Sequence, residues 1–217
     1  MRIIDGYFYF LSDSFFDKFP DKYLKQEHDT TKRPHYAAFQ DEKTSLYWLV
    51  PCSSRVEKYE RIIQDRKTKN KATDGIKIIK VRDNKRVLLF QDMFPSTEIY
   101  VKEPYIRAGL PVHIGNQKIV SELKKNAKMV SQKLLKGIKF TPTQPNIAQI
   151  EKAMLEELRK IKNEASTETR NQNKQTPAPG QKSIYQRISE IEAQAANNGQ
   201  PSKPPHMANK KENESTL

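Results

Sequence analysis

The sequence predicts an α+β fold in which a twisted antiparallel β-sheet is flanked by helices and followed by a polar tail. Three observations support this prediction. Short β-branched and aromatic runs occupy residues 1–114, two amphipathic helical patterns follow up to about residue 161, and residues 166–217 carry few apolar side chains. A chain of 217 residues suits one domain with an appendage, and about 160 residues comfortably support a single hydrophobic core.

The strand signals come as successive hairpins, which favour antiparallel pairing over strand–helix–strand units. The polar turn DEKTS joins one pair of strands, and Asp83-Asn84 joins a second pair. We expect Pro51 to end regular pairing in its strand, because proline has no N–H to donate. This arrangement predicts a small SH3-like or barrel-like core. The predicted strands are Ile3–Leu11, Tyr36–Phe39, Leu46–Val50, Ile76–Arg82, Arg86–Phe90 and a short Val112–Ile114.

Two helices are predicted after the strands. The first runs from about Asn116 to Lys136 and stops at Gly137, a residue suited to the left-handed conformation of a helix end. The second follows Asn146, which can cap it. Each has an apolar stripe at helical spacing, and the first carries lysines on its opposite face. The stripes are Ile119, Leu123, Ala127, Val130 and Leu134 in the first helix, and Ile147, Ile150, Met154, Leu158 and Ile161 in the second.

Residues 1–165 are expected to form one domain, and residues 166–217 a low-complexity, mostly disordered tail. The tail is rich in Asn, Gln, Ser and Pro, and its net charge is +2, against +11 for residues 1–165. Such a composition buries too little apolar surface to offset the entropy of ordering. Within residues 183–196, Ile184, Ile188 and Ile191 recur at helical spacing. This pattern is typical either of a transient helix or of a short docking helix for a partner.

The charge and the cysteine count restrict the class of protein. A net charge of +13 indicates an anionic partner, most simply a nucleic acid. The single Cys52 excludes a disulfide framework and a cysteine-based zinc site. No apolar run reaches the roughly 18–20 residues that span a bilayer, and Asp5 interrupts the start. We therefore expect no signal peptide, no membrane partner and a reducing, cytoplasmic location.

The sequence lacks the signatures of several enzyme classes. It has no Gly-rich phosphate loop, no nucleophile elbow, and neither an HExxH nor a CxxC motif. A metal site built from His28, His35 and His113 has no supporting carboxylate spacing. We therefore expect neither a metal nor another cofactor.

A candidate phosphate site follows the most hydrophobic predicted strand, in YWLVPCSSRVEK at residues 47–58. Ser53 and Ser54 precede Arg55, and Lys58 is within one helical turn. Hydroxyl and backbone N–H groups orient an oxyanion, while Arg and Lys neutralise it. The same residues are also typical of a helix start, where the serines only cap a helix beginning near Arg55. The two interpretations are compatible, because a helix N-terminus itself attracts anions.

Other basic and aromatic residues are candidates for nucleic-acid contact. In KRPHY at residues 32–36, a proline stiffens the entry to a strand. The basic run QDRKTKNKATDG is expected to form a mobile, solvated loop that makes non-specific phosphate contacts. Tyr residues facing outward from the first strand would stack on bases, although aromatic residues more often pack in the core. The candidates are Lys32, Arg33, Tyr36, Tyr9, Arg66, Lys67, Lys69, Lys71, Lys124 and Lys128.

The order and spacing of these motifs resemble those of a known family. RPHY, followed by a strand, a turn and YWLVPCSSRVEK, resembles the RPY…YxxPLSSPK pattern of the ToxN/AbiQ endoribonuclease toxins of type III toxin–antitoxin systems, in which the antitoxin is an RNA. IKIIKVRDNKRVLLFQDMFPS is similar to that family's strand–turn–strand unit ending in an Asn-Met-Ile-Pro type of segment. The basic helix at 117–136 also falls where the family has one. The resemblance covers roughly residues 1–160 and is closest to the CptN-like branch.

The resemblance implies a metal-independent endoribonuclease that leaves a 2′,3′-cyclic phosphate and a free 5′-hydroxyl. The family's active-site hydroxyl falls on Ser54, with Ser53 beside it. The lysine that follows in the family falls on Arg55 or Lys58, because RVEK replaces PK in this chain. We add His35 as a group for proton transfer, a hypothesis that is ours and not the family's.

The resemblance also implies partners. These are a structured, repeat-derived antitoxin RNA that occupies the site like a product strand, cellular or phage RNA as substrate, and an RNA-bridged homo-oligomer. Two other classes of function stay open: a non-catalytic nucleic-acid-binding module, and an SH3-like barrel that mediates protein contacts. The protein-contact alternative leaves the charge of +11 on residues 1–165 unexplained.

Overall fold

The computed structural model describes residues 2–24 and 33–172, with side chains as far as residue 164. The chain divides into a first unit of residues 1–164 and a second of residues 165–217. The sheet and the candidate site both belong to the first unit. The helix predicted at 183–196 lies outside the described residues, and the predicted domain boundary at residue 165 stays a prediction.

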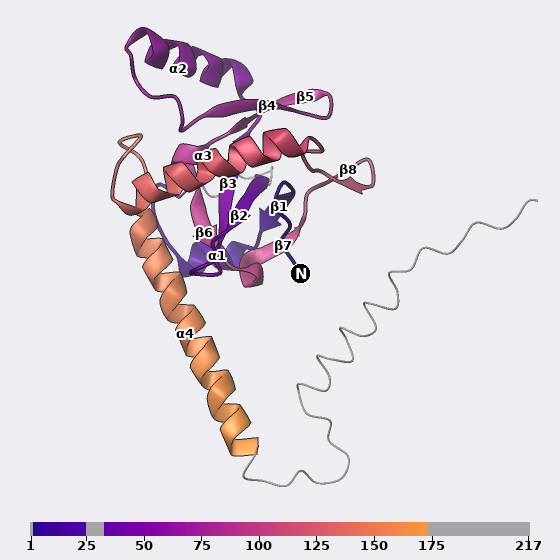
Figure 1. Cartoon of the computed structure of the whole chain (residues 1–217), viewed down its shortest axis with the longest axis vertical. Helices are drawn as coiled ribbons and strands as arrows, with labels where there is room; N and C mark the ends of the chain where they lie inside the picture. The colour runs from indigo at the N-terminus through magenta and orange to yellow at the C-terminus, as the bar shows by residue number, and fades with distance from the viewer. Residues whose placement is uncertain (1, 25–32, 173–217) are drawn as a thin grey trace, which may run out of the picture. The chain divides into compact units, whose positions relative to one another are not determined.

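A mostly antiparallel sheet flanked by helices forms the centre of the first unit, which confirms the predicted fold class (Figure 1). Its strands are β1 (Phe8–Leu11), β2 (His35–Gln40), β3 (Tyr47–Ser53), β4 (Lys77–Val81), β5 (Asn84–Leu88), β6 (Phe94–Ser96) and β7 (Val101–Pro104). Neighbours run in the order β4-β5-β3-β2-β1-β7, and β6 pairs with the first half of β3. A separate hairpin consists of β8 (Ile106–Arg107) and β9 (Leu110–Pro111).

The first predicted helix is α3 (Gln117–Leu135), and both of its predicted ends are confirmed. The Asn116 side chain accepts hydrogen bonds from the backbone N–H groups of Lys118 and Ile119. At the other end Gly137 has a φ of +77°, and its N–H donates to the carbonyl of Leu134. The next N–H, that of Ile138, reaches back to Lys133, which completes a Schellman stop. The helix packs its apolar stripe on the sheet, across β2.

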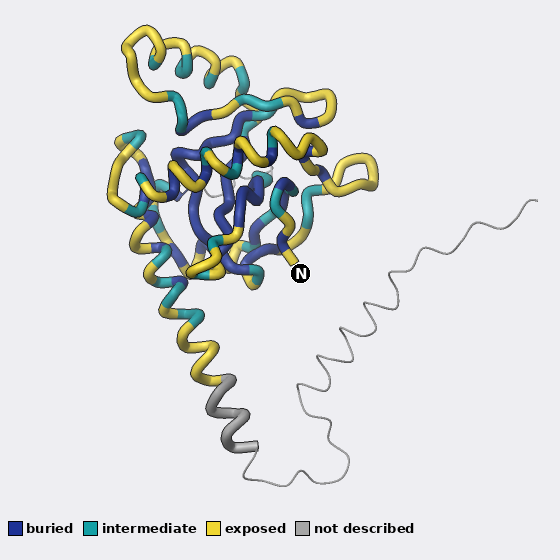
Figure 2. The backbone as a smooth tube through the Cα atoms, in the orientation of Figure 1, coloured by how far each residue is buried: buried dark blue, intermediate teal, exposed yellow. Residues whose placement is uncertain are grey.

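The second predicted helix is α4 (Ile147–Gln172). Asn146 caps it, since its Oδ1 accepts a hydrogen bond from the Gln149 N–H at 3.2 Å. Ile147 and Met154 are buried as predicted, but Ile161 is 41% exposed. The predicted stripe is therefore wrong at its last position, because the helix continues past the surface that its first turns cover (Figure 2).

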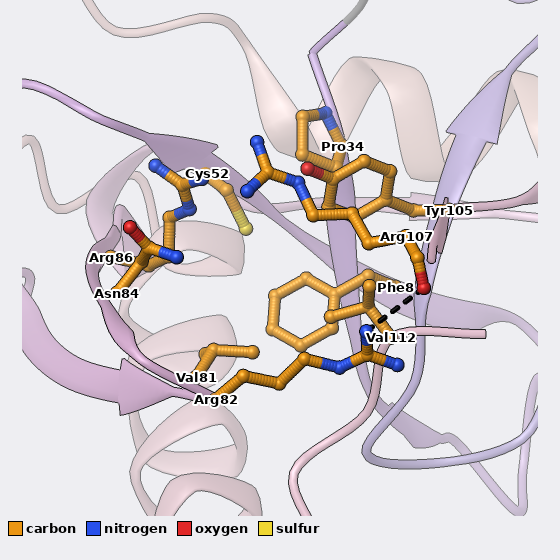
Figure 3. Close-up of a pocket in the computed structure, with 10 residues that line it drawn as sticks. All are labelled: Phe8, Pro34, Cys52, Val81, Arg82, Asn84, Arg86, Tyr105, Arg107 and Val112. Atoms are coloured by element: carbon orange, nitrogen blue, oxygen red, sulfur yellow. Dashed lines mark hydrogen bonds between the residues drawn. The ribbon is translucent and has the colours of Figure 1, made fainter. Parts of the chain in front are cut away.

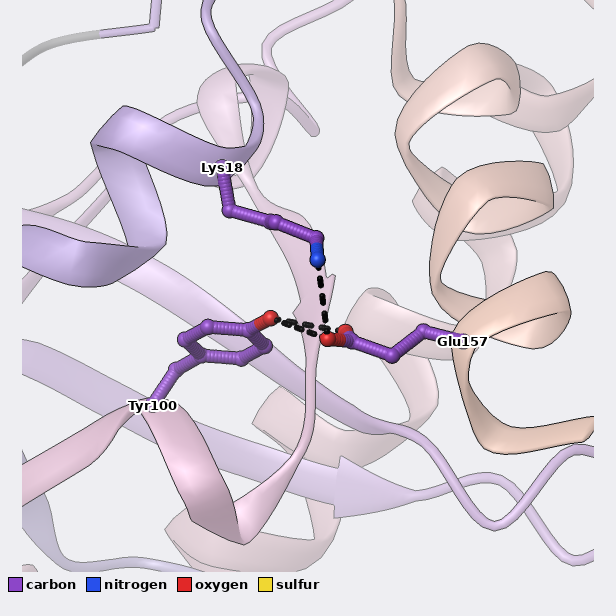
Figure 4. Close-up of polar contacts among 3 residues, drawn as sticks. All are labelled: Lys18, Tyr100 and Glu157. Carbon is purple, nitrogen blue, oxygen red and sulfur yellow. Dashed lines mark hydrogen bonds and ion pairs between the residues drawn. The ribbon is translucent and has the colours of Figure 1, made fainter. Parts of the chain in front are cut away.

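A polar cluster fixes α4 against the body of the first unit (Figure 4). The Tyr100 hydroxyl donates to the Glu157 carboxylate, at 2.8 Å from Oε1 and 2.7 Å from Oε2. Lys18 Nζ lies 3.5 Å from Glu157 Oε1. These residues come from α4, from the short helix α1 (Asp13–Lys18) and from the 3₁₀ turn η2 (Glu98–Tyr100).

Helix α2 (Val56–Thr68) was not expected at its full length, and it corrects the prediction of a mobile basic loop. Arg66 and Lys67 lie in its last turn, and Lys69 is the residue at its C-terminal end. The helix forms because one face covers a second small apolar cluster, made by Ile76, Val87 and Leu89 with half-buried residues of α2. Figure 2 shows the outward side of α2 as exposed.

Three further differences concern strand ends. Strand β3 continues through Pro51, where the sequence predicted an end. The missing N–H costs no ladder bond, because β3 changes partner there, from β6 to β5. The turn between β4 and β5 is Arg82-Asp83, one residue earlier than predicted. Residues 112–114 form no named strand, and the strand nearby is β9, with an isolated bridge from Tyr7 to His113.

Candidate nucleic-acid site at the end of strand β3

The two serines lie where β3 ends and α2 begins. Ser53 is the last residue of β3, and its Oγ accepts a hydrogen bond from the Arg55 N–H at 3.2 Å. The carbonyl of Ser54 accepts from the Val56 N–H at 2.9 Å. Ser54 is exposed, and no hydrogen bond joins its hydroxyl to another side chain or backbone group in the described ranges. Ser53 thus supports the helix start, whereas the Ser54 hydroxyl is available to a ligand.

Strand pairing puts one arginine on each side of the serines. The register of β5 against β3, continued by one residue beyond Ser53, places Arg86 opposite Ser54. The register of β2 against β3, continued past His35, places Arg33 opposite Ser53. The cations come from strands that are distant in sequence, so only the folded sheet brings them to this edge.

The same two arginines, Arg33 and Arg86, affect the pKa of the Cys52 thiol. Cys52 is buried, and this burial raises the pKa of its thiol to about 12. Arg33 and Arg86 act in the opposite direction and lower the pKa of the thiol, because positive charge nearby favours the thiolate. Both guanidinium groups therefore act on the residue that precedes the two serines.

A pocket opens beside this strand end (Figure 3). Its floor is apolar, and three arginine side chains reach it from the β4–β5 and β8–β9 hairpins. No Asp or Glu is among the residues that line it. Within the described part of the chain, no ion pair joins these arginines to a carboxylate. The lining residues are Phe8, Pro34, Cys52, Val81, Val112 and Tyr105, with Arg82, Asn84, Arg86 and Arg107.

Backbone geometry fixes Arg82 at the edge of the pocket. Its φ is +52°, in the left-handed region that non-glycine residues rarely adopt. Its guanidinium donates hydrogen bonds to the carbonyls of Arg107 at 2.9 Å and Leu110 at 3.4 Å. These bonds tie the β4–β5 turn to the β8–β9 hairpin and help to offset the backbone strain.

Tyr105 forms a wall of the pocket. Its N–H donates to the carbonyl of Phe8 at 2.7 Å, and its ring meets that of Phe10 edge-on at 5.3 Å. The guanidinium carbon of Arg107 lies 5.9 Å from the centre of the Tyr105 ring. The ring therefore holds the arginine side chain next to the pocket.

The structure does not place His35 at the site surface. His35 is 1% exposed, its ring meets Phe94 at 5.4 Å, and neither ring nitrogen has a hydrogen-bond partner among the described residues. Burial, together with the nearby Arg33, lowers its pKa to about 3. A neutral, enclosed imidazole cannot touch a substrate, so its expected role in proton transfer is wrong for this conformation.

The two tyrosines expected to contact nucleic acid, Tyr9 and Tyr36, are also buried. Tyr36 packs against Phe8, with ring centres 5.3 Å apart. The hydroxyl oxygen of the buried Tyr9 accepts a hydrogen bond from the Ile4 N–H at 2.9 Å. Burial raises the pKa of both phenols. Core packing, the alternative considered for the aromatic residues of the first strand, holds for Tyr9, and Tyr36 is buried in the core as well.

The basic candidates fall into different groups. Arg66 stabilises the fold, because its guanidinium donates hydrogen bonds to Gln91 Oε1 at 3.1 Å and to the Phe140 carbonyl at 3.4 Å. Lys124 pairs with Asp5 at 2.8 Å. Lys69 is exposed and pairs with Asp65. Five other candidates are exposed: Arg55, Lys58, Lys67, Lys71 and Lys128. Lys32 lies outside the described residues.

Sequence reasoning missed the residues that line the pocket. Arg82 precedes the predicted Asp83-Asn84 turn, Asn84 belongs to it, and Arg86 begins the next predicted strand, so the sequence contains a basic hairpin. Its position beside Ser54 depends on the β3–β5 register, which no local pattern reveals. Tyr105 precedes β8 and Arg107 is its last residue, and a strand of two residues gives no periodic signal.

Two searches for other site types gave no candidate within the described ranges. No group of three His, Cys, Asp or Glu side chains there could hold a metal ion. None of the helices described is long and apolar enough to span a bilayer.

Comparison with known proteins supports the fold. No protein-family model matches the sequence, and no curated protein matches it. Among solved structures, AbiQ, a lactococcal anti-phage endoribonuclease belonging to a type III toxin–antitoxin system, matches with a TM-score of 0.54 and 12% identity, over 71% of this chain and 99% of that chain. The chain shares the fold of AbiQ. This likeness confirms the fold that the resemblance to the ToxN/AbiQ family implied.

A second solved structure belongs to a bacterial antiviral system regulated by a processed non-coding RNA. It matches with a TM-score of 0.46 and 12% identity, over 67% of this chain and 95% of that chain.

Proposed function

We propose that the protein is an endoribonuclease toxin of a type III toxin–antitoxin system, which cuts RNA without a metal ion at Ser54. The observation that carries this proposal is the exposed Ser54 hydroxyl directly after β3, with Arg86 on the adjoining strand β5 and Arg33 two residues before the adjoining strand β2. The fold shared with AbiQ, an endoribonuclease of that class, supports the reaction type. The net charge of +13 supports an RNA partner.

The chemistry uses the substrate's own nucleophile. The 2′-oxygen of one nucleotide attacks the adjacent phosphorus and forms a 2′,3′-cyclic phosphate, while the bond from phosphorus to the 5′-oxygen breaks. The 2′-OH proton passes to solvent, and the departing 5′-oxygen takes up a proton to become a hydroxyl. The enzyme therefore needs no covalent intermediate, and holding the 2′-oxygen in line with the breaking bond supplies much of the rate.

The residues at the strand end have distinct roles in this proposal. The Ser54 hydroxyl donates to a phosphate oxygen, with Ser53 keeping the turn in place. Arg86 and Arg55 stabilise the negative charge that grows on the phosphate, and Lys58 adds to the local positive field. The N-terminus of α2 directs its backbone N–H groups and the positive end of its dipole to the same region.

Inhibition follows from the same surface. An antitoxin RNA lying across Lys128 of α3, Lys67 in the last turn of α2 and Lys71 in the segment after it would cover the site as a product-like strand. Electrostatics supplies the affinity, and the folded shape of the RNA supplies the selectivity. An RNA that touches two copies of the protein would form an RNA-bridged homo-oligomer.

A non-catalytic RNA-binding module is the second candidate. The burial of His35 favours it, because the site then lacks an imidazole near neutral pKa for acid–base catalysis. Under the nuclease proposal, positioning and charge stabilisation must supply the rate without that group.

One experiment separates the two candidates. RNA is digested in EDTA with the wild-type protein, with Ser54→Ala and with Ser121→Ala, an exposed serine on α3 that serves as a matched control. We expect Ser54→Ala to slow cleavage by about 10²–10³-fold, the usual loss of one oxyanion donor, with RNA binding kept. Binding without cleavage by the wild type would support the non-catalytic module instead.

A further inference from the structure

The pocket at Cys52, two residues before Ser54, combines two kinds of surface that a simple phosphate site does not need. Phe8, Val81, Val112 and the buried Cys52 give it an apolar floor. The guanidinium groups at its edge belong to Arg82, Arg86 and Arg107. Ligand sites in proteins typically pair an apolar lining with a few convergent polar groups.

A bare phosphate fits the edge of the pocket but not its floor. Phosphate oxygens require donors on several sides, and an apolar floor removes water without replacing its hydrogen bonds. A nucleotide provides both parts, since its base has apolar faces and its phosphate is anionic. Arginine suits this combination, because its planar guanidinium stacks on flat rings and also binds phosphate oxygens.

The pocket is built to keep its shape. The Arg82 guanidinium joins the two hairpins that carry the arginines, through the carbonyls of Arg107 and Leu110. The Arg107 side chain is held over Tyr105. Because the Arg82 bond to Arg107 uses a backbone carbonyl, the side chain of Arg107 is not needed for this link.

We propose that this pocket holds the unpaired base of one RNA nucleotide, adjoining the phosphodiester that lies at Ser54. The base rests on the apolar floor, with the guanidinium of Arg107 stacked on its exposed face. Arg86 lines the pocket and precedes Val87, the residue paired with Ser53, so in this proposal it contacts the phosphate that joins the two positions. The assignment to RNA rests on the proposed function. The combination of an apolar lining with arginine side chains, which suits a base together with a phosphate, does not depend on that function.

The test measures binding of small probes to the full-length Ser54→Ala protein, which removes cleavage from the experiment. The probes are the four nucleoside 3′-monophosphates, ribose 5-phosphate and inorganic phosphate, titrated at one ionic strength. Each is repeated with Arg107→Ala and with Tyr105→Leu added. Arg159→Ala, an exposed arginine on α4, is the matched control.

We expect at least one nucleotide to bind about tenfold or more tightly than ribose 5-phosphate, the gain typical of stacking one base. Arg107→Ala should weaken that nucleotide about 5- to 100-fold and leave inorganic phosphate within about twofold, while Arg159→Ala changes neither. Equal binding of nucleotide and ribose 5-phosphate, or no effect of either pocket substitution on a folded protein, would overturn the proposal. Amide spectra of each variant establish that it is folded.

A second readout separates this proposal from the proposed function. If the wild type cuts RNA, Arg107→Ala should alter the distribution of cleavage positions, since a lost base contact changes the preference beside the cut. Cleavage with an unchanged distribution, together with no base-dependent binding, would contradict the subsite and leave the nuclease intact. Base-dependent binding without any cleavage would contradict the nuclease and leave the pocket as a nucleotide site.

Discussion

Arg82 donates a hydrogen bond from Nη1 to the backbone carbonyl of Arg107 at 2.9 Å, and so joins the two hairpins that carry the pocket's arginines. Arg82 makes this contact from a left-handed backbone conformation, with φ at +52°. A strained residue beside a pocket is typical of a site whose shape matters for function. The relationship suggests that the backbone strain at Arg82 and the position of the β8–β9 hairpin are coupled.

Arg82→Gly tests this coupling. Glycine removes the strain of the left-handed conformation but also removes both tethering bonds, so the free energy of unfolding should change by less than about 1 kcal/mol. Amide hydrogen exchange over residues 105–112 should become faster, because the hairpin loses its link to β4–β5. The measurement is exchange by mass spectrometry or NMR, with α3 as the internal reference. Unchanged exchange over 105–112 would show that the tether does not hold the hairpin.

Because His35 is buried, we expect the free energy of unfolding to depend on pH. Its pKa is lowered from the ordinary 6.5 to about 3 by burial, so between these values the unfolded state binds a proton that the folded state does not. Stability is therefore complete above about pH 6.5 and falls as the pH is lowered, by at most about 1.4 kcal/mol per pH unit from this group.

Urea unfolding at pH 7 and pH 5 measures this effect, with His35→Phe and His35→Gln as the comparison. We expect the wild type to lose roughly 2 kcal/mol more than either variant over this interval. Because the comparison uses the change with pH, a variant that is less stable at pH 7 is still informative. An equal loss in wild type and variants would mean that His35 is protonated in the folded state.

We expect the hydrogen bond between Tyr100 and Glu157 to stabilise the packing of α4. Tyr100→Phe removes the hydroxyl donor from the Glu157 carboxylate, whose side chain is 22% exposed, and should lower the free energy of unfolding by about 1–2 kcal/mol. Lys18 is 58% exposed, and Lys18→Ala should cost less than about 0.5 kcal/mol, because solvent screens exposed ion pairs. The control for urea unfolding is Tyr59→Phe, a half-buried tyrosine on α2 whose hydroxyl has no hydrogen bond in the described structure. A loss of similar size in both phenylalanine variants would argue against a specific role for the Glu157 contact.

The exposed lysines predict the salt dependence of RNA binding. If binding neutralises six to ten phosphates, affinity should fall by about 10³–10⁵ between 50 and 200 mM salt. Replacing Lys67, Lys71 and Lys128 together by Ala should reduce the slope of log K against log salt by about 2, at ~0.7 per single-strand contact. Lys152→Ala with Lys160→Ala, two exposed lysines of α4, should leave the slope unchanged. A flat salt response of the wild type would exclude this electrostatic mode.

Much of the fold could be predicted because its signals are local. The apolar strands on either side of DEKTS, the cap at Asn116 and the stop at Gly137 each depend on residues close in sequence. The short strands β6 to β9 could not be predicted, since two to four residues carry no measurable period. Helix α2 has Tyr59, Ile62 and Ile63 at helical spacing, but the composition of its basic end is typical of a solvated loop.

The site could be predicted only in part. Ser54 is recognisable because polar residues directly follow an apolar strand. Arg86 is not recognisable, because its place beside Ser54 depends on the register of two strands separated by α2 and β4. The burial of His35, Tyr9 and Tyr36 depends on how the sheet is covered on each face, which residue type alone does not determine.

The most direct test of the central claim is the single-turnover cleavage rate, in EDTA, of an RNA oligonucleotide that spans a mapped cleavage position. Wild type and Ser54→Ala are compared on the all-ribose strand and on the same strand with one 2′-deoxy nucleotide at the cut. The account predicts a 2′,3′-cyclic phosphate product, no cleavage of the deoxy strand, and a loss of about 10²–10³-fold in Ser54→Ala. Cleavage of the deoxy strand, or a Ser54→Ala protein that cuts as fast as the wild type, would contradict it.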